Sequence, residues 1–221
     1  MNKVLFIAYQ FPPMGGAGVR RSFQFVQNLP NSGYHPVVVT IESGFASALG
    51  KHHDHSPMNE INQGVTIHRL PPRVYHNVIQ RLQYWRIYRL FWFAFYPLFW
   101  EKGALWPLFE SKKIAQIGKD QNCKIVYTTS SPYFTIILGW WLKKKHGFKW
   151  VADIRDPFTD CYGYVFPSKT HWYIARKFEH WLLKKADHVI VNNLEVKKRF
   201  TESYGFSSEK ITTIHNIIAH D

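Results

Sequence analysis

A glycine-rich loop near the start of the chain has the composition of a phosphate-binding site. Gly15 and Gly16 lead directly into a helical pattern that begins near Ala17. Glycines let a backbone approach a ligand closely, and a helix N-terminus offers unpaired N–H groups with partial positive charge. Arg20 and Arg21 follow closely enough to contact the same anion, and Arg20 is the candidate for this role. The loop matches neither the dinucleotide fingerprint nor the P-loop, so a generic glycine turn is the alternative.

Two more polar segments follow apolar runs that resemble strands. Ser130 and Ser131 follow one run, and Arg155 and Asp156 follow the next. Ligands of open parallel sheets bind at the carboxyl ends of the strands, so we expect these side chains near one site. The serine hydroxyls and the Asp156 carboxylate can hydrogen-bond to hydroxyl groups of a ligand, and the Arg155 guanidinium suits a phosphate. Helix capping by the serines and a structural Arg155–Asp156 ion pair are the alternatives.

Strands and helices are predicted to alternate along the chain. Seven short runs are apolar on consecutive residues rather than alternate ones, as in strands of a parallel sheet covered on both faces. Gly33, Gly147 and Gly205 stand where intervening helices should end. This order predicts one α/β domain with a Rossmann-like, doubly wound parallel sheet. The predicted strands are Lys3–Tyr9, Val37–Ile41, Val65–Leu70, Lys124–Thr129, Trp150–Ile154, His188–Asn192 and Ile211–His215, and the predicted helices are Ala17–Leu29, Val78–Phe95, Leu105–Gln121, Tyr133–His146, Thr170–Ala186 and Leu194–Ser203.

The composition of the chain indicates what kind of partner it binds and in which cellular compartment it works. The net charge of +13, from 28 Lys and Arg against 15 Asp and Glu, favours an anionic partner such as nucleic acid, acidic lipid or a phosphorylated substrate. Two cysteines without paired spacing favour the cytosol. Leu90–Trp100, at 11 residues, is shorter than the roughly 20 that span a bilayer, so no transmembrane helix is expected.

An aromatic and basic segment between Tyr84 and Trp100 is a candidate membrane contact. Arg86 and Arg89 lie among its aromatic residues, which include Trp92. Aromatic rings at headgroup depth with arginines on anionic phosphate are typical of an interfacial helix. A helix buried in the domain core is the alternative.

Several segments together resemble family 4 glycosyltransferases over nearly the whole chain. The opening strand and glycine loop, the Ser-Ser-Pro turn, the Asp-x-Arg-Asp-Pro segment and the last strand are all similar to that family, with Ile154, Phe158 and Ile217 as departures. These segments are Phe11-Pro12-Pro13-Met14-Gly15-Gly16, Ser130-Ser131-Pro132, Asp153-Ile154-Arg155-Asp156-Pro157-Phe158-Thr159 and Ile211-Thr212-Thr213-Ile214-His215-Asn216.

The resemblance implies a retaining GT-B enzyme. Residues 1–221 would form its N-terminal, acceptor-binding domain, and the nucleotide-sugar-binding C-terminal domain would be absent from this chain, leaving it inactive alone. The implied substrates are a nucleotide-sugar and a glycan or lipid-linked acceptor in cell-surface polysaccharide synthesis. In such an enzyme Ser130 and Ser131 would hold acceptor hydroxyls, and Asp156 would accept a hydrogen bond from a sugar hydroxyl. The donor phosphate would contact Gly15, Gly16 and Arg20. No metal or cofactor is implied, and the expected location is the cytoplasmic face of the plasma membrane.

Two other classes of protein remain open at this point. The basic charge fits a nucleic-acid-binding module, although no recognition motif is present, and we expect no nucleic acid partner. The second class is another Rossmann-type enzyme, one that uses a dinucleotide. Such an enzyme would need an acidic residue after the second strand, where Glu42 stands. His52, His53 and His55 fit no metal-ligand spacing and are expected to lie in a solvated loop.

Overall fold

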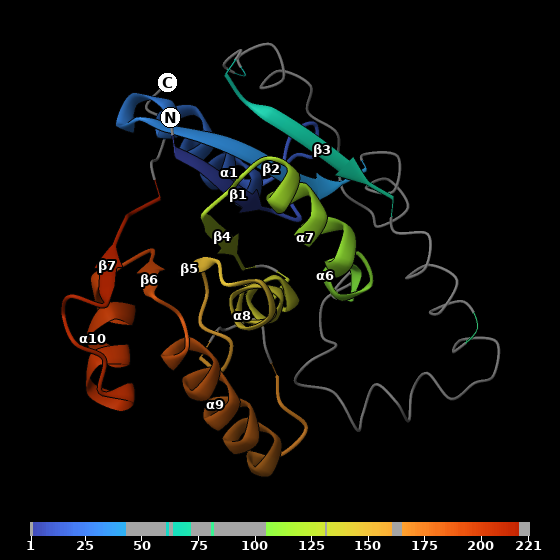
Figure 1. The fold of residues 1–221 in the computed structure, drawn as a ribbon. Coiled ribbons are helices and arrows are strands. Elements are labelled where there is room, and N and C mark those ends of the chain that lie inside the picture. The colour runs from blue at the N-terminus through green and yellow to red at the C-terminus, as the bar shows by residue number, and fades with distance from the viewer. Residues whose placement is uncertain are drawn as a thin grey trace.

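The fold is a single parallel sheet flanked by helices (Figure 1). The structure is a computed structural model that describes residues 2–42, 61, 64–71, 81, 105–130, 132–160 and 165–216. Seven strands lie in the order β3-β2-β1-β4-β5-β6-β7, and every neighbouring pair is parallel. The strands are β1 (Asn2–Ile7), β2 (Tyr34–Ile41), β3 (Thr66–Leu70), β4 (Ile125–Thr129), β5 (Lys149–Ile154), β6 (His188–Val191) and β7 (Ile211–Thr213).

Three of the described helices end at a glycine. Gly33, Gly147 and Gly205 have φ values of 79°, 74° and 65°, a left-handed conformation that glycine adopts without steric cost. Side chains cap the starts of the last two helices: Ser168 accepts from His171 N–H and Asn193 accepts from Val196 N–H. The helices are α1 (Ala17–Asn28), η1 (Leu29–Ser32), α6 (Trp106–Phe109), α7 (Ser111–Asp120), α8 (Phe134–His146), α9 (Lys169–Lys184) and α10 (Leu194–Tyr204).

Two separate cores cover the two faces of the sheet. Alternate residues of β1 divide between them, because side chains of a strand point to opposite faces. Val4 and Phe6 pack with Val26 of α1 on one face. Leu5 and Ile7 belong to the larger core on the other face, which includes side chains of α7, α8, α9 and α10. The sheet is therefore a middle layer between α1 and these later helices.

Trp150 shows how closely α8 packs on the sheet. Its indole is fully buried, and Nε1–H donates to Thr128 Oγ1 at 2.8 Å. The same ring lies against Gly139 of α8, where a Cβ would overlap it. Glycine at position 139 therefore allows the helix to approach the sheet at this point.

The predicted fold class is confirmed, and each predicted strand is present to within three residues at either end. The predicted helix Leu105–Gln121 is instead two helices, α6 and α7, that meet at Glu110. The predicted helix Val78–Phe95 lies outside the described residues, except for Arg81. His52, His53 and His55 also lie outside them.

Candidate active site

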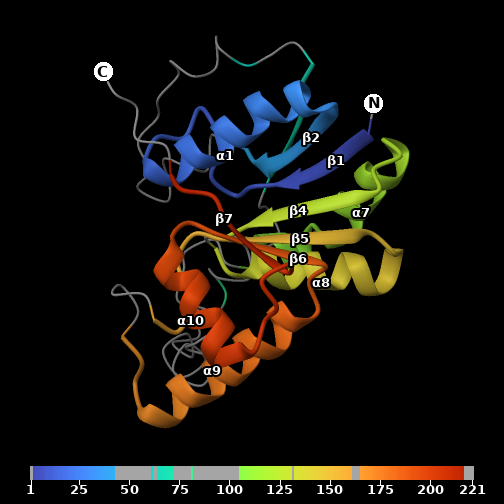
Figure 2. The same cartoon turned by 90° about the vertical axis from the view of Figure 1, so that its left-hand side faces the viewer.

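The predicted site residues follow the strands at the centre of the sheet. The chain runs outward from β1 to β2 and β3 and then returns to β4 beside β1, so the strand order reverses between β1 and β4. Open α/β sheets bind ligands at the carboxyl ends of the strands at such a switch point. Figure 2 shows β1 and β4 side by side with their arrowheads pointing the same way. The glycine loop follows β1, and Ser130 follows β4.

The glycine loop ends at an uncapped helix start. Gly16 is the N-cap of α1, with φ 115° and ψ 163°, a backbone conformation that residues with a Cβ rarely adopt. Gly16 is exposed, Gly15 is half-buried, and no side chain caps the helix. Val19 N–H donates to the Gly16 carbonyl at 3.0 Å. Within the described residues, the N–H groups before it in the first turn have no such partner and are therefore available to an anion.

Arg155 joins this loop to the ends of β4 and β5. Its backbone N–H donates to Ser130 Oγ at 3.1 Å, and its Nε–H donates to the Ser130 carbonyl. Its guanidinium lies against Gly18 in the first turn of α1, where a Cβ would overlap it and the Gln10 side chain. The structure thus brings together three segments that the sequence analysis proposed separately.

Asp156 lies beside this cluster and is exposed. No hydrogen bond or ion pair joins its carboxylate to another residue in the part of the chain that the structure describes. The adjoining Pro157 is buried, which anchors the chain next to this free carboxylate. The arrangement therefore leaves the Asp156 carboxylate available to a ligand.

A buried ion pair that the sequence analysis missed lies beneath the site. Arg21 Nη2 contacts Asp153 Oδ1 at 2.7 Å, and both side chains are almost fully buried. Burial alone would lower the pKa of Arg21, but the hydrogen bonds and charge of Asp153 together raise it. Arg21 Nη1 also donates to the Ile214 carbonyl and to Asn216 Oδ1, at 2.7 and 3.0 Å. Arg21 therefore links α1 to β5 and to the segment after β7, whereas Arg20 is exposed and has no ion-pair partner among the described residues.

Ser130 has a different role from the capping alternative. The N-cap of α8 is Tyr133, and no side chain caps that helix. Ser130 is buried, and its hydroxyl oxygen instead accepts the Arg155 N–H. The other predicted site residues, Ser131, Arg86, Arg89, Trp92 and Trp100, lie outside the described residues.

Glu179 of α9 anchors the loop that carries Asp156. Its Oε1 accepts from Phe158 N–H at 2.7 Å and from the Tyr133 hydroxyl at 3.0 Å. Its Oε2 accepts from the hydroxyls of Thr159 and Tyr204, at 2.9 and 2.8 Å. A fully buried carboxylate needs such donors. The sequence analysis did not identify this residue, and a lone glutamate within an apolar helical pattern was the available signal.

Glu179 should make the stability of the chain depend on pH. Burial raises the pKa of its carboxyl from its ordinary value, although the four donors oppose the shift. The folded chain then binds this proton more readily than the unfolded chain, so the free energy of unfolding should fall as pH rises from about 4.3 through the raised pKa. Urea unfolding of the parent and of Glu179→Gln over that range should show that the difference between their free energies of unfolding changes with pH. A constant difference would contradict this assignment.

The described part of the chain offers no metal centre or membrane span. Its residues contain no group of three or more His, Cys, Asp or Glu side chains placed to hold a metal ion. Across the same residues, none of the helices combines the length and the apolar character needed to cross a bilayer.

The sheet order is that of a Rossmann-like α/β domain and matches the fold of GT-B glycosyltransferases. Residues 15–217 match the model of the glycosyl transferase 4-like domain. The chain belongs to this family. None of the curated proteins matches the chain in sequence.

Solved structures share the fold at low sequence identity. A glycosyltransferase from Rickettsia africae is 15% identical to this chain with a TM-score of 0.54. The match covers 97% of this chain and 42% of the Rickettsia protein. Sucrose-phosphate synthase from Thermosynechococcus elongatus is 14% identical with a TM-score of 0.55, covering 97% and 48%. S. aureus MnaA, solved with UDP, is 11% identical with a TM-score of 0.55, covering 98% and 44%. The chain thus spans less than half the length of these structures.

Proposed function

We propose that this chain is the N-terminal, acceptor-binding domain of a retaining glycosyltransferase. In the longer enzyme, a C-terminal domain would bind the nucleotide-sugar, and the two domains would face each other across a cleft. The observation that carries this proposal is the meeting of the glycine loop, Ser130, Arg155 and Asp156 at one sheet edge in a chain of this family. Family membership favours this function over nucleic-acid binding or dinucleotide chemistry.

The glycine loop and its neighbouring cations would stabilise the departing diphosphate. Negative charge develops on the diphosphate as the sugar leaves, and fixed N–H donors stabilise that charge most in the transition state. The N–H groups at Gly15 and Gly16 would supply such donors, and Arg20 would add a positive charge. Arg155 would be held in place for the same phosphate by its two hydrogen bonds to Ser130.

Asp156 would act on the acceptor. Its exposed carboxylate can accept a hydrogen bond from the attacking hydroxyl and draw off part of the proton as the new glycosidic bond forms. Ser131 would bind another acceptor hydroxyl, and Ser130 would contribute chiefly by fixing Arg155. No metal or cofactor enters this scheme, because the charges of the site and of the proposed C-terminal domain would stabilise the diphosphate.

The proposed acceptor is a glycan or a lipid-linked glycan in cell-surface polysaccharide synthesis. Such an acceptor would place the enzyme at the cytoplasmic face of the plasma membrane, with anionic lipid as a partner. The aromatic segment with Arg86, Arg89, Trp92 and Trp100 is one proposed contact with that surface. Nucleic acid is not a proposed partner.

Ligand-dependent stability of the longer enzyme tests this proposal. A ligand that binds only the folded protein raises the free energy of unfolding by RT ln(1 + [L]/Kd), and the melting temperature rises with it. Nucleotide-sugars should raise the melting temperature of an enzyme that includes the second domain, while NAD and RNA should leave it unchanged. Stabilisation by NAD or RNA alone would overturn the assignment.

The 221-residue chain should fold alone but transfer no sugar. Its seven strands and both cores are present within the described residues, whereas the proposed donor-binding groups belong to the other domain. A cooperative thermal transition together with undetectable turnover of a panel of nucleotide-sugars is the expected result. Measurable transfer by the purified chain would contradict the two-domain proposal.

A further inference from the structure

The outward side of α9 carries aromatic, apolar and basic side chains without an acidic one. The only carboxylate in this helix, Glu179, is fully buried. On the opposite side, Tyr173, Ile174 and Trp181 are 56%, 58% and 43% exposed. A helix that presents such residues together with lysines is typical of attachment to a membrane surface. The outward residues are the adjacent pair Tyr173 and Ile174, followed at intervals of three or four residues by Lys177, Trp181 and Lys184.

A groove between the ends of α8 and α9 continues this side of the molecule. Trp140 and Trp181 meet edge to face, with ring centroids 5.2 Å apart. The groove has a volume of about 580 Å³, and two lysines from each side line it. The carboxylate of Asp187, just beyond this groove in sequence, is paired with Lys143 at 2.6 Å. The lining lysines are Lys143, Lys144, Lys184 and Lys185.

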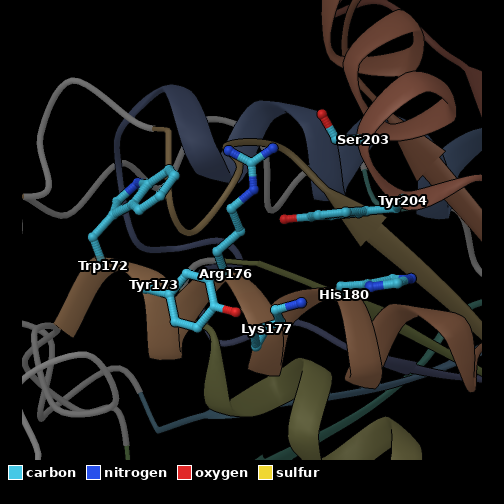
Figure 3. A pocket seen from close by; sticks show the side chains of 7 residues that line it. All are labelled: Trp172, Tyr173, Arg176, Lys177, His180, Ser203 and Tyr204. Carbon is cyan, nitrogen blue, oxygen red and sulfur yellow. The ribbon is translucent and has the colours of Figure 1, made fainter. Parts of the chain in front are cut away.

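A second hollow, of about 290 Å³, lies between α9 and α10 (Figure 3). The Arg176 guanidinium lies 5.0 Å from the centroid of the Trp172 ring and extends toward Ser203. Lys177 also lines the hollow, with its Nζ 5.4 Å from the centroid of the Tyr173 ring. Two cations and a hydroxyl in a small aromatic-walled hollow suit a phosphate group.

Most of these cations have no acidic partner. Within the described ranges, no carboxylate lies within salt-bridge distance of Lys144, Lys177, Lys184 or Lys185. Lys144 and Lys177 lie over aromatic rings instead. The charge of this surface is therefore complementary to an anionic partner, and the exposed Ile174 and Trp181 favour a partner with an apolar layer beneath its charges.

We propose that α9, together with the end of α8, binds the surface of an anionic lipid bilayer. Headgroup phosphates would occupy the groove and the hollow, while Ile174 and Trp181 would reach headgroup depth. This inference extends the membrane partner proposed above to a surface different from the segment between residues 84 and 100. Vesicle binding requires neither a sugar donor nor an acceptor. The chain could therefore fail to bind vesicles even if the longer enzyme transfers sugar, and it could bind vesicles even if the proposed transfer is wrong.

Vesicle co-sedimentation of the chain tests this inference. The two probes are phosphatidylcholine vesicles and vesicles in which one third of that lipid is replaced by phosphatidylglycerol. The parent chain should bind the anionic vesicles at least about tenfold more tightly, and added salt should weaken that binding. The double variant Lys177→Glu/Lys184→Glu should lose at least about tenfold in affinity. Ile174→Ser, which removes an exposed apolar side chain without altering charge, should also weaken binding severalfold.

A charge-matched control separates this surface from general electrostatic attraction. Lys112 and Lys113 are exposed on α7, which lies apart from α9 in both views (Figures 1 and 2). Lys112→Glu/Lys113→Glu should change affinity less than about threefold. Equal losses in both double variants, or parent-like binding of the α9 variants, would overturn the proposal. Heparin binding tighter than vesicle binding, and unaffected by Ile174→Ser, would also overturn it by assigning the surface to a soluble polyanion.

Discussion

Asp156→Asn is expected to lower the rate of sugar transfer by the longer enzyme about a hundredfold or more. The carboxylate is exposed beside Arg155 and has no partner among the described residues, so its charge contributes little to folding. A group that takes up part of the acceptor's proton acts mainly in the transition state, so kcat should fall more than KM changes. Asparagine keeps the shape of the side chain but is not a base.

Initial rates and unfolding measurements on the same preparation check this result. The melting temperature of Asp156→Asn should remain close to that of the parent, because replacing an exposed, unpaired side chain usually changes stability little. A large fall in melting temperature with near-normal turnover would show that the carboxylate serves the fold. Asp156→Glu, which retains the charge on a longer side chain, should recover part of the lost rate.

Asp153→Asn should have the opposite outcome, with a loss of roughly 3 to 5 kcal/mol in the free energy of unfolding. Asp153 is 1% exposed and accepts from both Arg21 and Thr129. Asparagine would leave the buried guanidinium of Arg21 without a countercharge. Urea unfolding of the 221-residue chain measures the loss directly.

Asp153→Asn and Asp156→Asn can be compared directly with each other. Asp153 and Asp156 are three residues apart and undergo the same chemical change, so each serves as the control for the other. Because Arg21 also donates to Ile214 and Asn216, Asp153→Asn should increase amide hydrogen exchange around β7 more than around β2. A loss of less than about 1 kcal/mol would show that the buried pair contributes little net stability.

Local patterns were sufficient for most of the fold. Continuous apolar runs such as Val37–Ile41 predicted buried parallel strands, because only strands covered on both faces lack polar alternation. Gly147 and Gly205 predicted helix ends, because the left-handed conformation there favours glycine. The break at Glu110 was missed, since α6 and α7 together read as one helical period.

The candidate site was predictable only in part. That Gly15, Ser130 and Arg155 follow strands was visible along the chain, and the rule for carboxyl ends of parallel strands placed them at one edge. Their mutual contacts were not visible, because the Arg155 guanidinium reaches both Ser130 and Gly18 only after the strands are ordered. The prediction that Ser130 caps the next helix was wrong, because its hydroxyl oxygen instead accepts from Arg155 N–H at the end of the neighbouring strand.

The class of fold, the family and the segments of the candidate site could be predicted from the sequence. Strand burial, helix ends and motif order depend on neighbouring residues, so they can be read along the chain. The partners of the charged side chains could be identified only in the folded structure. Arg21 and Asp153 are 132 positions apart, and Glu179 binds four groups from three other segments. Local periodicity marks which positions are buried, but the choice of a buried charge's partner depends on strand order and on the packing of helices across the sheet. The same packing turned Arg21 inward and left Arg20 and Asp156 exposed.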